Sequence, residues 1–210
     1  MQRRQPDVLW FGDGSRREIA LTFDDGPHPR DTPGVLEVLA KHKVRATFFL
    51  IGRDVERVPH LVKEIHARGH RIGIHCHRHL PFPWEEPRTL RGHLDGTRNT
   101  IANLCGVSPE TIRDVRPPYG LYTKDTLSQL RDWNYRLVMW NCIPPHFLQP
   151  LGWSIKQVME AAVPGSIVVL HDGHGHGTLA VQILESILPG LKAEGYEFVT
   201  IEHMQEKKQA

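Results

Sequence analysis

The sequence predicts an α/β fold, an incomplete barrel of about seven parallel strands that alternate with helices. Short apolar runs alternate with amphipathic stretches from end to end, which is the pattern of repeated βα units. Several runs are continuously apolar, such as residues 46–51 and 166–170, as expected for parallel strands buried on both faces. Acidic and histidine side chains follow the ends of these runs, where barrels of this kind place their active sites.

The strands are predicted from short runs rich in β-branched and aromatic residues. In chain order these runs are residues 18–23, 46–51, 71–75, a short one that starts at Val115, then 136–140, 166–170 and 198–201. Turn residues bound them, because Gly26 and Pro27 follow the first run and Pro164 and Gly165 precede the sixth.

The helices are predicted from apolar positions three and four residues apart. They cover about residues 33–42, 54–68, 86–104, 123–133, 154–163 and 179–194. The predicted ends have suitable residues: Asp31 or Thr32 can cap the first helix, Pro33 suits its first turn, Ser154 can cap the fifth, and Gly195 ends the last.

Length and composition indicate a single domain, residues 1–210, with a core that needs no disulfides. The 26 basic and 24 acidic residues give a net charge of only +2, without a basic block, so we expect no nucleic-acid partner. Three widely spaced cysteines, Cys76, Cys105 and Cys142, are expected to be thiols. A monomer is the default assembly, since no feature of the sequence sets the oligomeric state.

No apolar stretch is long enough to span a membrane, and residues 1–7 are polar and have no signal-peptide core. Taken as complete, the chain is expected to be cytoplasmic. If an N-terminal segment was removed, an extracellular or cell-envelope location would apply. The polar tail, residues 206–210, is expected to fray.

Candidate metal ligands follow the first and third predicted strands. Asp24 and Asp25 end the first, and His75 and His79, four residues apart, follow the third. One carboxylate and two imidazoles bind a divalent cation such as zinc and leave coordination positions open, so we assign Asp25, His75 and His79 as ligands. Each segment also fits a simpler structure, the acid pair a β-turn and the histidines a solvated loop.

Other residues near these ligands suggest acid–base chemistry. Consecutive side chains diverge, so Asp24 is left as a general base for water that the cation activates. Arg116 would keep Asp24 ionised and oriented, although its Arg-Pro-Pro-Tyr-Gly segment also fits a rigid turn. His171 ends a strand and is a candidate general acid, or else a capping histidine. His77 projects differently from its neighbours and is a weaker ligand candidate.

The glycine-rich loop after His171 also contains histidines. His174 and His176 are expected to belong to a mobile connector, with binding of a second metal as a minor alternative.

Taken in order, five segments resemble the successive motifs of the polysaccharide deacetylase family, carbohydrate esterase family 4, whose catalytic unit is the NodB homology domain. They are TFDDGP at 22–27, HCHRH at 75–79, RPPYG at 116–120, Trp140, and LHD at 170–172. The resemblance implies a distorted seven-stranded (β/α) barrel. It also implies a metal-dependent hydrolase that removes N- or O-linked acetyl groups from polymers such as chitin, peptidoglycan or xylan.

The resemblance also implies roles for single residues. It implies Asp24 as base, His171 as acid, Arg116 as the partner of Asp24, the Tyr119 backbone N–H at the oxyanion, Trp140, Leu170 and Tyr119 as substrate contacts, and Asp25, His75 and His79 as metal ligands. The implied cofactor is Zn²⁺, with Co²⁺, Ni²⁺ or Mn²⁺ as alternatives, and the implied partner is an acetylated carbohydrate.

Two positions depart from the family pattern. Cys76 stands where the family usually has serine or threonine, which weakens any hydrogen bond that positions this loop. After Trp140 the chain has no acid until Glu160, whereas the family's fourth motif usually has aspartates there. The carboxylate expected to orient His171 is therefore missing, and Asn141 or a residue of another loop could replace it.

The leading hypothesis is removal of N-acetyl groups from polymers or oligomers that contain N-acetylglucosamine. One alternative is a carbohydrate- and metal-binding protein with weak or no catalysis. Another is a metal-dependent hydrolase of small cyclic amides. Four loop aromatics could stack on sugar rings or pack locally: Trp84, Tyr122, Phe147 and Trp153.

Overall fold

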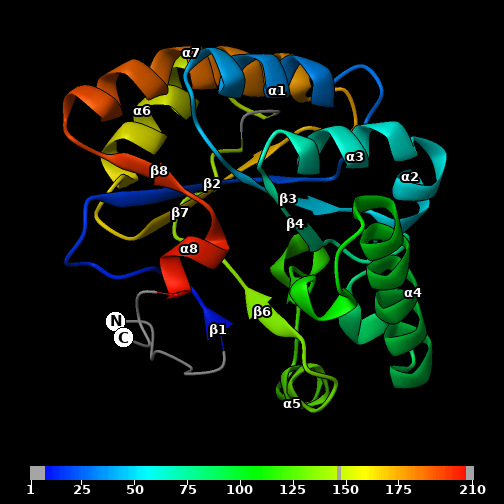
Figure 1. The fold of residues 1–210 in the computed structure, drawn as a ribbon. Helices are drawn as coiled ribbons and strands as arrows, with labels where there is room; N and C mark the ends of the chain where they lie inside the picture. The colour runs from blue at the N-terminus through cyan, green and yellow to red at the C-terminus, as the bar shows by residue number, and fades with distance from the viewer. Residues whose placement is uncertain (1–7, 146–147, 207–210) are drawn as a thin grey trace.

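The computed structural model describes residues 8–145 and 148–206, and within them eight parallel strands form one curved sheet (Figure 1). The strands are β1 Val8–Leu9, β2 Glu18–Asp24, β3 Thr47–Leu50, β4 Arg71–Ile74, β5 Asp114–Val115, β6 Arg136–Val138, β7 Ser166–His171 and β8 Glu197–Val199. The predicted α/β barrel of parallel strands is confirmed, and only the short β1 is additional.

Helices connect most of the strands. They are α1 Thr32–Lys41, α2 Gly52–Arg57, α3 Pro59–Ala67, α4 Pro87–Cys105, α5 Lys124–Asp132, α6 Leu151–Ala161, α7 Gly177–Ala193 and α8 Ile201–Glu206. Three single-turn 3₁₀ helices are η1 Phe82–Trp84, η2 Pro109–Thr111 and η3 Pro118–Gly120.

Strand β2 is the centre of the sheet. The order is β1-β6-β5-β4-β3-β2-β7, and β8 pairs with β2 beside its first residues, whereas β3 pairs with its last. The chain beyond β6 then approaches β7, where Cys142 forms a parallel bridge with Val168. This bridge joins the two sides of the sheet, so the strands enclose a distorted barrel.

The alternation of side chains along β2 separates the outer core from the barrel interior. Leu21 and Phe23 belong to the large apolar cluster that includes the inner faces of the helices. Asp24 lies on the opposite face, inside the barrel. The interior is crowded, because a Cβ on Gly73 would lie only 2.6 Å from Phe49 Cε1. Glycine at this position therefore leaves space for a large ring beside the site.

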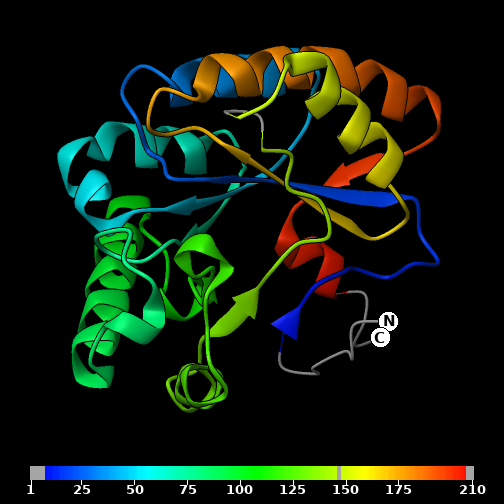
Figure 2. The same cartoon turned by 180° about the vertical axis from the view of Figure 1, so that it is seen from behind.

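The helices form a layer on the outside of the sheet. Helices α6, α7 and α1 lie side by side along one side, and α3, α2 and α4 continue the layer (Figures 1 and 2). Helix α8 instead packs Ile201 and Met204 into the buried cluster that contains Ala20 and Ile167. None of the described helices is long and apolar enough to cross a membrane.

Two helix predictions need correction. The single helix expected over residues 54–68 is two helices, because Val58 adopts a non-helical conformation (φ −132°, ψ 58°) before Pro59. Ser154 was expected to begin a helix, but α6 begins at Leu151 and Ser154 is buried within it. Pro150, which cannot donate a backbone hydrogen bond, marks the true start.

Other differences lie near the chain ends. The last strand was expected over residues 198–201, but it ends at Val199 and Ile201 begins α8. Expectations for residues 1–7, for residues 207–210 of the tail and for Phe147 fall outside the described residues. The three cysteines form no disulfide, as predicted.

Candidate metal centre and active site

The acid pair is held in a tight turn at the end of β2. Asp25 has a left-handed backbone conformation (φ 72°) and the Gly26–Pro27 peptide is cis. The Asp172 N–H donates to the Asp24 carbonyl at 3.1 Å. Gly173 packs directly on this turn, since a Cβ there would lie 2.2 Å from the Asp25 carbonyl oxygen. The two consecutive carboxylates therefore diverge, as the sequence predicted, and they have different partners.

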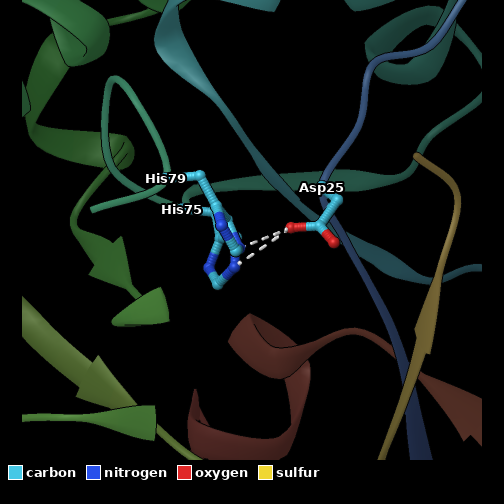
Figure 3. Close-up of side chains that lie close together, drawn as sticks. All are labelled: Asp25, His75 and His79. Carbon is cyan, nitrogen blue, oxygen red and sulfur yellow. Dashed lines mark ion pairs between the residues drawn. The ribbon is translucent and has the colours of Figure 1, made fainter. Parts of the chain in front are cut away.

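Asp25, His75 and His79 converge on one point (Figure 3). Asp25 Oδ1 lies 3.0 Å from His79 Nε2 and 3.4 Å from His75 Nε2. Ligand atoms bound tetrahedrally at the usual zinc distances are about 3.3 Å apart. One carboxylate oxygen and two imidazole nitrogens at this spacing therefore fit a divalent cation.

The His75 ring is oriented for a metal by a contact on its other side. His75 Nδ1 lies 2.9 Å from the Arg116 carbonyl oxygen, to which it can donate. In the neutral imidazole this hydrogen bond places the proton on Nδ1, so that Nε2, which faces Asp25, can offer its lone pair to a metal. The chain between the ligands bends sharply, with positive φ at Cys76 (71°) and His79 (56°).

The Cys76 side chain lies inside this bend. Its Sγ accepts a hydrogen bond from the His79 backbone N–H at 2.7 Å, so the thiol takes part in holding the loop. Burial raises the pKa of Cys76 to about 12, and the group is a neutral thiol at ordinary pH.

Electrostatics favour an ionised Asp25. Burial alone would raise the pKa of this carboxyl, but its contacts with His75 and His79 outweigh burial and hold the pKa well below its usual range. A carboxylate that stays charged while enclosed by imidazoles is suited to a cation.

Asp24 has a different partner from Asp25. Arg116 is fully buried in the barrel, and its Nη1 donates to Asp24 Oδ1 and to Thr22 Oγ1, both at 2.7 Å. Its other nitrogens donate to the carbonyls of Val138 (3.2 Å) and Met139 (3.1 Å). The guanidinium is therefore fixed on several sides, and it orients the Asp24 carboxylate.

A cavity of about 210 Å³ opens beside these groups. Its walls include Asp24, Asp25, His75, His79, Pro117, Tyr119, Trp140, Ile143, His171 and His176. Tyr119 has a left-handed backbone conformation (φ 59°), and its exposed ring stands edge-on to the His79 ring at 4.9 Å. The structure thus brings together all the predicted site residues except Arg116, which lies behind Asp24, and Leu170.

Leu170 needs correction as a cavity residue. It is fully buried and belongs to the core cluster shared with the helices. Neighbouring residues of a strand point to opposite faces, so Leu170 cannot share a face with His171. The residue of β7 on the same face as His171 is Val169, which a strict two-residue periodicity would have identified.

Three cavity residues were not assigned from the sequence as part of this site. Pro117 and Ile143 had no chemical signal, whereas His176 was assigned to a connector. The loop around His176 is anchored, because Asp31 Oδ2 accepts from the Gly175 N–H at 2.8 Å and a Cβ on Gly177 would lie 2.3 Å from Asp31 Cβ. His174 Nε2 lies 4.0 Å from Asp25 Oδ2, at the edge of the metal centre.

The surroundings of His171 differ from the family pattern. Asn141 cannot orient it, because its Nδ2 donates to Ala161 O (3.2 Å) and Ser166 Oγ (3.1 Å), and its Oδ1 accepts from the Ile167 N–H (2.8 Å). Burial lowers the pKa of His171, although the charges of Asp24 and Asp25 oppose the shift. Burial therefore disfavours the protonated ring, and the two carboxylates favour it.

Asp172 does not replace the missing carboxylate either. Its Oδ2 accepts from Thr32 Oγ1 at 2.6 Å, and the side chain packs against Gly26. Burial raises the pKa of Asp172 to about 7. This acid supports the start of α1 and the acid turn.

The loop aromatics divide into two groups. Trp84 and Trp153 are exposed (75% and 70%), whereas Tyr122 is half-buried against the core. Trp84 and Trp153 thus remain available for ligand contact, and Tyr122 serves local packing.

Comparisons with known proteins agree with this geometry. Residues 11–138 match the family model described as polysaccharide deacetylase. The peptidoglycan-N-acetylglucosamine deacetylase of Bacillus cereus is 34% identical over an alignment of 203 residues, which covers 92% of this chain and 70% of the relative. The chitooligosaccharide deacetylase of a Bradyrhizobium species is 34% identical over 201 residues, covering 89% of this chain and 90% of the relative.

The fold also matches solved structures. The crystal structure of the Bc1960 peptidoglycan N-acetylglucosamine deacetylase, in complex with a substituted N-oxidanyl-benzamide, superposes with a TM-score of 0.89 at 32% identity. The match covers 94% of this chain and 92% of that one. The similarity therefore extends over nearly the whole chain.

Proposed function

This chain belongs to the polysaccharide deacetylase family, and we propose that it hydrolyses the N-acetyl group of N-acetylglucosamine units in a peptidoglycan- or chitin-type carbohydrate. The observation that carries this proposal is the division of labour within the acid pair. Asp25 faces His75 and His79, while Asp24 faces Arg116, and both acids line one cavity. Metal-assisted hydrolysis of an amide uses a cation site and a separate base, and this arrangement supplies both.

Asp25, His75 and His79 would hold the cation. When bound, it would polarise the acetyl carbonyl and increase the acidity of water. We propose Zn²⁺, because two imidazoles and one carboxylate with open positions are typical of catalytic zinc, and Co²⁺, Ni²⁺ or Mn²⁺ as substitutes.

The remaining residues move protons and position the substrate. Asp24, held by Arg116, takes the proton of the water whose oxygen attacks the acetyl carbon. His171 donates a proton to the sugar nitrogen as the C–N bond breaks, so that acetate and a free amine leave. The Tyr119 backbone N–H supports the developing oxyanion, and Trp140 forms a wall of the acetyl site.

Acetate release from chitooligosaccharides and from peptidoglycan fragments tests this function. The full chain, stripped of metal and reloaded with Zn²⁺, should release acetate, and the His75→Ala variant should not. Sugar binding without acetate release would instead identify a carbohydrate-binding protein. Turnover of cyclic imides without turnover of sugars would identify the small-amide hydrolase.

A further inference from the structure

The loop with the metal ligands His75 and His79 has a third histidine whose ring lies elsewhere. Of the described residues, only Asp25, His75 and His79 bring three potential ligand atoms within 4.8 Å of one another. His77 instead lies against helices α2 and α4. Its ring stacks on the His93 ring of α4, with centroids 5.0 Å apart and an interplanar angle of 25°.

The contact surface for His77 is specific in shape. A Cβ on Gly52 would lie 2.5 Å from His77 Nδ1 and 2.2 Å from Thr97 Oγ1, so only glycine permits this packing. The first N–H groups of α2 also hold the loop backbone: Gly52 donates to the Cys76 carbonyl (3.0 Å) and Arg53 to the His77 carbonyl (3.2 Å). The loop of residues 75–79 is thus held to α2 by main-chain hydrogen bonds and to α4 by the His77 ring.

The His93 ring is fixed in turn by an acidic residue. His93 Nδ1 lies 2.5 Å from Glu85 Oε2, and the Glu85 side chain is only 4% exposed. Glu85 directly follows η1, so this contact joins the loop after the metal ligands to the middle of α4. A buried carboxylate is costly unless it is paired, which makes the Glu85–His93 contact a firm support.

These contacts do not form a second metal site. The two rings turn their faces toward each other, and among the described residues His77, His93 and Glu85 do not bring three potential ligand atoms within 4.8 Å of one another. The His93 ring is held by Glu85, and it restricts the positions open to the His77 ring stacked on it. His77 lies two residues from each of the ligands His75 and His79. Residues around a metal site that orient its ligands typically change metal affinity about 10- to 100-fold when mutated.

We propose that Glu85 and His93 are positioning residues for the metal centre, which act through the His77 ring to hold His75 and His79 in place. The proposal rests on the proposed function in taking the Asp25–His75–His79 centre as a metal site. It adds to that site a support from α4, through the side chains of Glu85 and His93.

The test measures Zn²⁺ affinity of the full chain by competition with a chromophoric chelator. His93→Ala should weaken Zn²⁺ binding about tenfold, and His93→Phe, which keeps a ring to stack on His77 but loses the contact with Glu85, should recover only part of the loss. His60→Ala, an exposed histidine of α3, is the matched control and should bind as the wild type does. Thermal unfolding of each metal-free variant shows whether it is folded.

A second pair of variants makes the test independent of one substitution. His77→Ala should weaken Zn²⁺ binding as His93→Ala does. The double variant should bind Zn²⁺ about as tightly as either single variant, because the two substitutions remove the same ring contact. Folded His93→Ala and His77→Ala with Zn²⁺ affinities within twofold of the wild type would overturn the inference. Absence of Zn²⁺ binding by the wild type would instead contradict the proposed metal site.

Discussion

Arg116 and Asp24 form a buried ion pair in the barrel interior, with Arg116 Nη1 2.7 Å from Asp24 Oδ1. The Arg116 guanidinium also lies over the Phe49 ring, 4.1 Å from its centroid. A lysine cannot reproduce this, because it lacks the planar fork that donates to several acceptors at once. The ion pair therefore both stabilises the folded protein and orients the carboxylate of Asp24, the proposed base.

Arg116→Met should destabilise the protein by about 3–5 kcal/mol, because it leaves the Asp24 carboxylate buried without its cation. Urea unfolding of the metal-free protein measures the loss. Arg116→Met combined with Asp24→Leu removes both charges and should recover part of the stability. If Arg116→Met alone were as stable as the wild type, the ion pair would have no importance for stability.

Asp24→Asn should lower the turnover number about 10²- to 10⁴-fold, the usual contribution of a general base. The amide keeps an oxygen for Arg116 to contact, and Asp24 is not part of the Asp25–His75–His79 group. Zn²⁺ affinity should therefore change little. Full activity with Zn²⁺ bound would refute the assignment of the base.

Zn²⁺ should stabilise the folded chain through His75 and His79. At a free concentration 100 times the dissociation constant, binding adds about 2.7 kcal/mol to the free energy of unfolding. Differential scanning calorimetry should show a rise in Tm with Zn²⁺ for the wild type and no comparable rise for His79→Ala. An equal rise in both would place the cation elsewhere.

The free energy of unfolding should decrease as the pH is lowered from about 6.5 to about 4, because of His70. This histidine is buried (3% exposed), its Nδ1 accepts from the Ala46 N–H at 3.1 Å, and burial, together with Arg68 and Arg45, lowers its pKa to about 4. The unfolded chain binds the proton near pH 6.5 and the folded chain only near 4, so protonation favours unfolding by up to about 3 kcal/mol.

The His70→Gln variant isolates this effect, since glutamine offers an acceptor for Ala46 but does not titrate. Its free energy of unfolding, from urea titrations at pH 7 and pH 4.5, should depend less on pH than that of the wild type. Identical pH dependence of the two proteins would show that His70 is not responsible.

Asn141→Asp should not restore the family's missing carboxylate. The Asn141 side chain is engaged with Ser166, Ile167 and Ala161, and an aspartate there would lose the donor to the Ala161 carbonyl. We expect a loss of about 1–3 kcal/mol in stability and an unchanged pH profile of turnover. A shifted pH profile would indicate that residue 141 does reach His171.

The fold was largely predictable because its signals are local. The apolar runs of β2 and β7 identify buried strands without knowledge of their partners. Errors occurred where a proline outweighed the apolar pattern, as at Pro59, or where a short segment is stabilised only by its contacts, as in α8. Leu170 was misplaced because the alternation was not applied within the motif.

The sequence by itself determined the order of strands and helices and the placement of Asp24, Asp25, His75, His79 and His171 at strand ends, since hydrophobic period and spacing are properties of neighbouring residues. Only the tertiary structure decided which groups meet. Arg116 reaches Asp24 across 92 positions, Asn141 is engaged with β7, and His77 turns to His93. Such contacts depend on barrel closure and helix packing, which bring together groups that no local pattern relates.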